Sequence, residues 1–474
     1  MSDPTIRLPA GSGLTRSVNC SDVRVVETGP SGASFTPVFC TLGGRTAILA
    51  DPGADRVADC SEALAAGELP SDDVHAVVEH DPDPERMPIP DRGPLAVGER
   101  RILEPCGWEP STSNPTPIAN DLDADDALRA VADAGVVGRG RADGAADEPV
   151  SELWRRSRGA DGDPVVVVHA NDTDNSADRL LCASVAGRVW DAARAVATTI
   201  GATDVVAFCG DADADAGARE AMRTAAADES VVAGPSSYLV GEPTMAMEAL
   251  EGADRIEARR RPPGPEEWGL YGRPTVVHTP RTLLAVRALL ADCGGRESRL
   301  VTIRGDVEAE AIVELSATAP LSAALSAVDG DGRRYVVGGR FGGVGSDLDV
   351  PASPSALASA GFGTGGVVEL LDADRCIVKT VGERVALARE ENCGRCVPCR
   401  EGTVQLHELL RAIYAGEFDA DGIDELAGTI AGTSLCDFGV DAMRPVRTAV
   451  DRFAAEFRAH ARGECPAGVC EVSP

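Results

Sequence analysis

The 474-residue chain contains a single lysine, Lys379, so arginine supplies all its other basic side chains. Acidic residues outnumber basic ones by 76 to 45, and the formal net charge is −31. Such a surface repels the phosphates of nucleic acids and of anionic membranes, and we expect neither as a partner. Dense carboxylates also keep a protein hydrated in concentrated salt, so the composition predicts a salt-adapted, halophilic protein. An acidic protein from a GC-rich genome is the alternative.

Aromatic residues make up only 4% of the chain, so its cores must be built mainly from Val, Ala and Leu. No apolar run approaches the roughly 18 residues that suggest a membrane span. The N-terminus also lacks the charged start and apolar core of a leader sequence. We therefore expect a cytoplasmic protein, in which the 14 cysteines are thiols or metal ligands rather than disulfides.

Hydrophobic patterns divide the chain into an α/β part and a helical part. "PVVVVHA" and "ATDVVAFCG" are apolar runs typical of buried parallel strands. "SVAGRVWDAARAVATTIG" and "RTLLAVRALLADCG" have helical periodicity and end at Gly, a common helix stop. Residues 298 to about 350 read as strands around one short helix, and from about 380 onward the pattern indicates a helical bundle.

Three closely spaced cysteines suggest a metal centre. Cys393, Cys396 and Cys399 form C-x2-C-x2-C within "ENCGRCVPCREG". A loop with this spacing can supply three ligands of a [4Fe-4S] cluster, and a distant fourth cysteine completes the set. Cys436, in "TSLCDFG", is the candidate for the fourth ligand. Structural zinc is the alternative, but zinc sites more often use paired C-x2-C units or histidine. Free thiols are a third interpretation.

These residues resemble a known family. "ENCGRCVPCREG" followed by "SLC" is similar to the iron–sulfur region of the NADH-binding flavoprotein subunit of respiratory complex I, which has counterparts in NAD-linked hydrogenases and formate dehydrogenases. "GPEEWGLYGRPTVV", "SSYLVGEPTMAMEALEG", "GVVGRGRADG" and "GFGTGGVVELLD" resemble further motifs of that family.

The resemblance implies a multidomain α/β fold and hydride transfer from NADH to FMN, followed by single-electron transfer to the cluster. It implies a degenerate thioredoxin-like segment, a flavin-type α/β domain, a ubiquitin-like β-grasp (SLBB-like) module, a linker with a strand, an iron–sulfur bundle and a cysteine-containing tail. These correspond to residues 1–85, 86–295, 296–350, 351–379, 380–460 and 461–474. By resemblance, the residues for FMN and NADH are Gly138, Arg139, Gly140, Asn171, Tyr238, Gly241, Glu242 and Thr244.

The flavin and nucleotide motifs nevertheless depart from the family pattern. Arg141 and Asp143 stand at family glycines of the glycine loop. A carboxylate there would repel a phosphate in a partly dry pocket. In the family motif V-N-N-V-E-T, both Asn are replaced, by His278 and Thr279, and the Glu is replaced by Arg281. These departures weigh against FMN and NAD(H) binding, whereas the cluster motif is complete.

The two ends of the chain show further differences from the family. Pro30 and Ser34 stand where hydrogenase-type relatives have cysteines of a ferredoxin segment, so we expect no [2Fe-2S] cluster there. Near the other end, "ECPAGVCEVSP" resembles a stretch that in several relatives leads into a two-cluster ferredoxin domain. The candidate ligands of a second, zinc-binding site are Cys376, His460, Cys465 and Cys470, and the alternative is free thiols.

Three functions remain open at this point. The first is an electron-transfer subunit of a hydrogenase-, formate dehydrogenase- or complex I-like oxidoreductase complex. The second is a working NADH:acceptor oxidoreductase with a rebuilt FMN site. The third is a non-enzymatic scaffold in which the cluster only stabilises the helical bundle. The content of flavin relative to iron distinguishes the second from the others.

Overall fold

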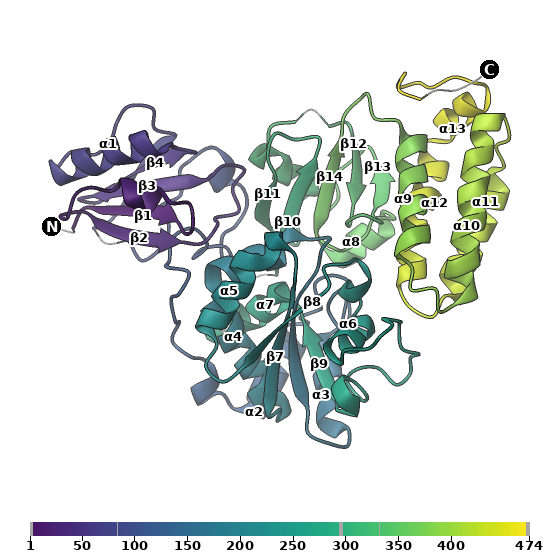
Figure 1. Cartoon of the computed structure of the whole chain (residues 1–474), viewed down its shortest axis with the longest axis horizontal. Coiled ribbons are helices and arrows are strands. Elements are labelled where there is room, and N and C mark those ends of the chain that lie inside the picture. Colours follow the sequence, from purple (N-terminus) through teal and green to yellow (C-terminus); the bar gives the residue numbers. More distant parts are fainter. Residues whose placement is uncertain (1–2, 83, 293–296, 331, 471–474) are drawn as a thin grey trace.

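The computed structural model describes residues 3–82, 84–292, 297–330 and 332–470. They form three β-sheets and a C-terminal helical bundle, arranged as shown in Figure 1. The N-terminal sheet lies to one side, the parallel and mixed sheets occupy the centre, and the bundle lies beside the mixed sheet. The expectation of a multidomain α/β fold with a helical C-terminal region is confirmed at this level.

The N-terminal sheet has five strands with one helix packed against it. Its strand order is β2-β1-β3-β4-β5, and only the β1–β2 pair is parallel. Ile6, Leu8 and Leu49 lie in its core, together with the thiols of Cys40 and Cys60. The elements are β1 (Thr5–Pro9), β2 (Arg24–Thr28), β3 (Pro37–Leu42), β4 (Arg45–Ala50), α1 (Ala54–Ala65) and β5 (Ala76–Glu79).

The central sheet is fully parallel, with strand order β8-β7-β6-β9. Successive valines of β6 belong to different cores, Val166 to one and Val167 to another, which explains why this strand is a continuous apolar run. The elements are α2 (Ala124–Asp133), α3 (Val150–Gly159), β6 (Val165–Ala170), α4 (Ser176–Ile200), β7 (Asp204–Gly210), α5 (Ala216–Ala225), β8 (Ser230–Gly234), α6 (Pro243–Leu250), β9 (Thr275–His278) and α7 (Pro280–Asp292).

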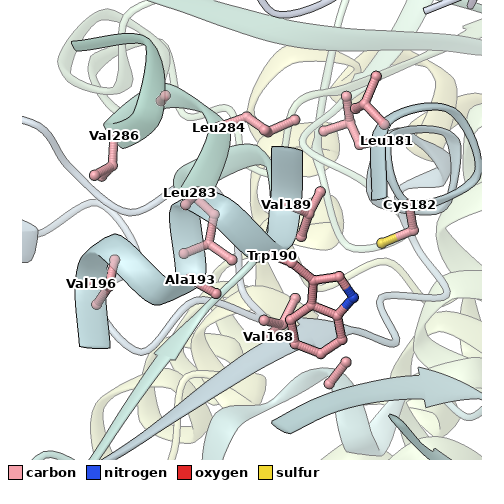
Figure 2. Packing of buried hydrophobic residues seen from close by; sticks show 14 of the residues in the cluster. Val168, Leu181, Cys182, Val189, Trp190, Ala193, Val196, Leu283, Leu284 and Val286 are labelled. Carbon is pink, nitrogen blue, oxygen red and sulfur yellow. The ribbon is translucent and has the colours of Figure 1, made fainter. Parts of the chain in front are cut away.

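Helix α4 contributes much of the central core. Its Trp190 is fully buried and donates its indole N–H to the carbonyl oxygen of Met222 at 2.9 Å. Figure 2 shows Trp190 beside Val189 and Ala193 of the same helix, with Leu283 of α7 close by. Most residues of α4 are buried, and the helix is therefore apolar around most of its circumference rather than along one stripe.

A second, mixed sheet follows, with strand order β11-β10-β14-β12-β13. Its central strand β14 pairs in parallel with β10 and antiparallel with β12, so this sheet extends beyond residue 350 into the stretch expected to hold a linker and a strand. The elements are β10 (Ser298–Gly305), β11 (Ala311–Ser316), β12 (Arg334–Val337), β13 (Gly343–Gly345), α8 (Pro354–Ser359) and β14 (Val367–Leu371).

The C-terminal bundle packs against the mixed sheet and against one loop of the central domain. Its core includes Leu406, Ile430 and Val446, and it continues into Tyr238 and Phe341 outside the bundle. This continuity fixes the bundle beside the parallel sheet's loops. The helices are α9 (Ile377–Glu391), α10 (Val397–Ala412), α11 (Ala420–Thr433), α12 (Phe438–Arg452) and α13 (Ala454–Ala461).

Short 3-10 helices connect several of these elements. In the part of the chain that the structure describes, no helix combines the length and apolarity needed to cross a membrane. The 3-10 helices are η1 (Leu14–Ser17), η2 (Pro94–Ala96), η3 (Ala119–Asp121), η4 (Asp213–Asp215), η5 (Leu239–Gly241), η6 (Leu270–Gly272), η7 (Leu321–Ala327) and η8 (Ile413–Ala415).

Candidate functional site

Four cysteines line one small cavity at the end of the bundle. Cys393 lies in the loop between α9 and α10, Cys396 is the N-cap of α10, and Cys399 lies in its first turn. Cys436 reaches the same cavity from the turn before α12. Two helices, α10 and α12, therefore begin beside this cavity, and the positive ends of their dipoles favour a negatively charged group there. The structure brings together all four thiols of the expected cluster site.

Hydrogen-bond donors surround these sulfur atoms. Burial alone would raise the pKa of Cys396, but backbone N–H groups of Leu435 and Cys399 outweigh it and lower this pKa. Burial raises the pKa of the Cys399 and Cys436 thiols to about 12. Four thiolates supported by N–H donors are the ligand set of a [4Fe-4S] cluster, which the N–H groups and helix ends would stabilise.

Two residues beside the cavity were not singled out from the sequence. The hydroxyl of Ser434 lies 3.3 Å from Sγ of Cys399. A Cβ on Gly439 would collide with the Ser434 side chain and would lie 3.3 Å from the same sulfur. Glycine thus lets the first turn of α12 approach the cluster ligands. The only signal in the sequence is a glycine three residues after Cys436, in "SLCDFG".

A second group of metal-type ligands lies at the opposite end of the bundle. Cys376 is the N-cap of α9, His460 lies in α13, and Cys465 and Cys470 follow in the tail. One ligand atom from each of the four residues lies within 4.8 Å of all the others. Ligand atoms around tetrahedral zinc are roughly 3.5 to 3.8 Å apart, as follows from metal–ligand bonds of about 2.0 to 2.3 Å. The group is therefore close to the geometry of a single-ion site.

The orientation of His460 suits a metal ligand. Its Nδ1 lies 2.8 Å from the carbonyl oxygen of Glu456, which can only accept a hydrogen bond, so Nδ1 carries the proton. Nε2 is then left with its lone pair and faces Sγ of Cys376 at 3.2 Å. A ring nitrogen held by a backbone carbonyl in this way is the usual second contact of a metal-binding histidine. Nearby, burial raises the pKa of Cys465, but backbone N–H groups led by that of Cys470 lower it to about 6.

The residues matched to the family's flavin and nucleotide motifs lie between the parallel sheet and the bundle. Tyr238 and Glu242 line a cavity of about 300 Å³ there. Glu242 also caps α6 by accepting the N–H of Met245 at 2.9 Å. The structure brings the other matched residues to the neighbouring loops rather than into the cavity lining: Gly138, Arg139, Gly140, Asn171, Gly241 and Thr244.

Several of these residues are engaged by internal partners. The backbone N–H of Arg139 donates to Oγ1 of Thr282 at 3.0 Å. The side-chain amide of Asn171 donates to the carbonyl oxygen of Pro235 at 3.1 Å. Thr244 donates its hydroxyl to the Glu242 carboxylate. These polar groups are therefore hydrogen-bonded within the protein.

Aromatic rings connect this cavity with the cysteine cavity. Phe438 lines both of them. It packs edge to face with Tyr238 and Phe341, with ring centroids 5.9 and 5.5 Å away. The two cavities are thus separated by one layer of side chains, and the rings fix the start of α12 relative to the central domain.

Comparison with known proteins supports the same assignment. Residues 379–460 match the NADH-ubiquinone oxidoreductase-F iron-sulfur binding region. The NADP-reducing hydrogenase subunit HndC of Solidesulfovibrio fructosivorans is 28% identical over 261 residues, which are 50% of this chain and 53% of HndC. The NuoF protein of the Streptomyces coelicolor NADH-quinone oxidoreductase is 32% identical over 259 residues, 50% of this chain and 58% of that protein. The chain spans slightly over half the length of these curated relatives.

A solved structure extends the comparison to the whole fold. A chain of an NAD+-reducing [NiFe]-hydrogenase in the air-oxidized state superposes with a TM-score of 0.66 at 24% identity. The match covers 97% of this chain and 85% of the hydrogenase chain, so the order of the domains is shared as well as the bundle. Together with the cysteine cavity, these similarities make the chain a NuoF-like protein, similar to the NADH-binding subunit of complex I and of NAD-reducing hydrogenases.

Proposed function

We propose that this protein is an electron-transfer subunit of an oxidoreductase complex and carries one [4Fe-4S] cluster. The ligands are Cys393, Cys396, Cys399 and Cys436. The observation that carries the proposal is their convergence on one cavity between two helix N-termini. When bound, the cluster supplies a centre that accepts and releases one electron at a time.

The position of the site suits exchange of electrons with a partner. Val397, directly between two of the ligands, is 59% exposed. Cys393 and Cys396 are only partly buried. A centre so near the surface can approach a redox group in another subunit, whereas a purely structural cluster has no need of exposure. Partners of the hydrogenase, formate dehydrogenase or complex I type follow from the similarity to subunits of such assemblies.

The decisive experiment uses the full chain, purified anaerobically in high salt. We expect about four irons per chain and an electron paramagnetic resonance signal on reduction. Oxidation and reduction by one-electron mediators should be reversible within the range of about −700 to +450 mV known for such clusters. Cys436→Ala should lose the signal, and Cys20→Ser, which changes a partly exposed cysteine far from the bundle, should keep it. Iron without reversible redox chemistry would instead favour the scaffold function.

The alternative enzyme function remains testable in the same sample. An NADH:acceptor oxidoreductase with a rebuilt flavin site should contain about one flavin for every four irons. It should also reduce an artificial acceptor with NADH. Iron without flavin and without this activity would exclude that alternative and leave electron transfer from a partner.

We also propose that the second ligand group holds a zinc ion that joins the tail to the bundle. Its three thiols and one imidazole come from Cys376, His460, Cys465 and Cys470, and their close approach supports this. Zinc has no redox chemistry in proteins, so its role here is structural. Metal analysis showing no zinc in protein purified without chelators would reject the site.

The finer domain assignments are part of the same proposal. Residues 1–85 form the thioredoxin-like segment without a [2Fe-2S] cluster, and 296–350 contribute to a β-grasp module. In the N-terminal segment, Cys40 lies within the hydrophobic core, and the carbonyl oxygen of Pro30 accepts the hydroxyl of Ser184 at 2.7 Å. A rhombic low-field resonance from an isolated 1–85 fragment would contradict the absence of that cluster. We further propose a cytoplasmic, salt-adapted protein, given its net charge of −31.

A further inference from the structure

The N-terminus of α7 offers the main-chain groups of an anion site. The helix follows directly after β9, at the carboxyl end of a parallel strand, where free N–H groups and the helix dipole attract phosphate in many α/β proteins. In this protein, carboxylates of the same chain already bind those groups. Oδ2 of Asp143 accepts the N–H of Thr279 at 3.2 Å, and Oδ1 of Asp178 accepts the N–H of Arg281 at 3.1 Å.

A chain of buried hydrogen bonds holds Asp143 in this position. The indole N–H of Trp154 donates to Nε2 of His278 at 2.8 Å, so the proton of the neutral ring lies on Nδ1. Nδ1 in turn lies 3.1 Å from Oδ1 of Asp143, which also accepts the N–H of Ala145 at 3.1 Å. Burial raises the pKa of Asp143, but His278 and the other hydrogen-bond donors outweigh it and lower this pKa below its usual value. The carboxylate is thus ionised and fully bonded.

The space beside the loop glycines is filled as well. A Cβ on Gly138 would collide with the carbonyl group of Ala145 and would lie 2.7 Å from Oδ1 of Asp143. A Cβ on Gly140 would lie 3.0 Å from Nη2 of Arg281. That guanidinium forms buried ion pairs with Asp178 at 2.8 Å and with Asp172 at 3.2 Å, and donates to the carbonyl oxygen of Gly365 at 2.9 Å. Neither glycine leaves its backbone open to a ligand.

The aromatic face beside the cavity is also covered. The guanidinium of Arg141 lies 3.6 Å above the ring of Tyr238 and donates to the carbonyl oxygen of this residue at 2.7 Å. It also packs against Gly241, where a Cβ would collide with it. A planar ring that stacked on Tyr238 would have to displace this arginine and its cation–π contact.

The remaining cavity is unfavourable for a phosphate. It has seven carboxylates against two guanidinium groups in its lining, and a dianion entering it would be repelled. The carboxylates belong to Asp147, Glu148, Asp172, Asp174, Glu242, Asp437 and Asp441, and the guanidinium groups to Arg141 and Arg444.

We infer that the chain closes its own nucleotide site: the Asp143 carboxylate occupies the anion position at the N-terminus of α7, Arg141 covers Tyr238, and the native protein excludes FMN. The residues present do not fit the flavin that the fold family implies. The consequence is specific, because removal of these two side chains should reopen the site, while the cysteine cavity is unaffected.

Binding of FMN and of inorganic phosphate to the full chain with its cluster tests this inference. Equilibrium dialysis or quenching of flavin fluorescence should detect no binding to the native protein up to millimolar FMN. The double variant Arg141→Gly, Asp143→Gly should bind FMN at least tenfold more tightly, and Asp143→Gly alone should gain affinity for phosphate. Asp147→Gly is the matched control, because Asp147 lines the same cavity without bonding α7 and should leave binding unchanged.

Two results would overturn the inference. One is about one FMN bound per native chain, which needs no variant and therefore does not depend on whether the substitutions fold. The other is a double variant that retains native circular dichroism yet binds no more FMN than Asp147→Gly, since the anion position would then not be held by Asp143. The cluster resonance is recorded in the same samples, so failure of this inference is distinguishable from failure of the proposed electron-transfer function.

Discussion

The side chains of Cys376 and His460 meet with Sγ and Nε2 3.2 Å apart, although 84 residues separate them in the chain. One residue begins the first helix of the bundle and the other lies in the last, so a metal held here would tie the two ends of the bundle together. It would also anchor the tail through Cys465 and Cys470.

We therefore expect His460→Ala to lower the zinc content and the stability of the bundle. Metal binding contributes its free energy to the folded state only, so loss of one ligand should lower the melting temperature of the C-terminal region by several degrees. Metal analysis and thermal unfolding followed by circular dichroism measure both effects. His407→Ala is the control, because this partly exposed histidine lies on α10 outside the ligand group. Equal losses in the two variants would contradict a specific role of His460.

A methyl group at Gly439 should disturb the cluster site without changing any ligand. Its Cβ would collide with the Ser434 side chain and approach Sγ of Cys399, so α12 would have to move away from α10. We expect Gly439→Ala to lower iron content by at least half and to weaken the reduced-cluster resonance.

Gly428→Ala provides the matched comparison within the neighbouring helix. Gly428 lies inside α11, and a Cβ there meets no atom within 4 Å. Alanine favours a helix interior over glycine by up to about 1 kcal/mol, so this variant should be slightly more stable and keep its iron. If both variants retained their clusters equally, close approach at Gly439 would not matter for ligand geometry.

Local patterns in the sequence predict much of the fold. The valines of β6 and the periodicity of α4 indicated buried strands and helices because these signals depend on neighbours along the chain. The central position of β14 in the mixed sheet was not predictable in this way. Its parallel pairing with β10 joins residues more than 60 positions apart, and no short-range pattern specifies such a partner.

The candidate sites show the same limit at the level of single residues. The sequence showed Asp143, His278, Thr279 and Arg281 as separate departures from a family pattern. It could not show that Asp143 bonds both His278 and Thr279, since 135 and 136 residues separate these partners. The departures are therefore mutually compensating: each new polar group satisfies another in a site that would otherwise leave buried groups unpaired.

Asp178 should make stability depend on pH in a defined direction. Burial raises its pKa to about 6, and Arg281 opposes this shift only in part. A carboxyl group with a raised pKa stabilises the folded state below the pKa of the unfolded chain, near 4, and this stability is lost as the pH rises through 6. Between pH 5 and pH 7 the loss amounts to about 1 kcal/mol for this one group.

Asp178→Asn removes that titration, so its unfolding free energy relative to the native protein should increase by about 1 kcal/mol from pH 5 to pH 7. Urea unfolding at each pH measures the difference. Asp204→Asn is the control: a hydrogen bond from Arg273 lowers the pKa of Asp204, which is therefore ionised in both states throughout this window. Its difference from the native protein should stay constant. A constant difference for Asp178→Asn as well would mean that Arg281 fully compensates for the burial of Asp178, and that the ion pair which closes the loop at Gly140 forms without cost.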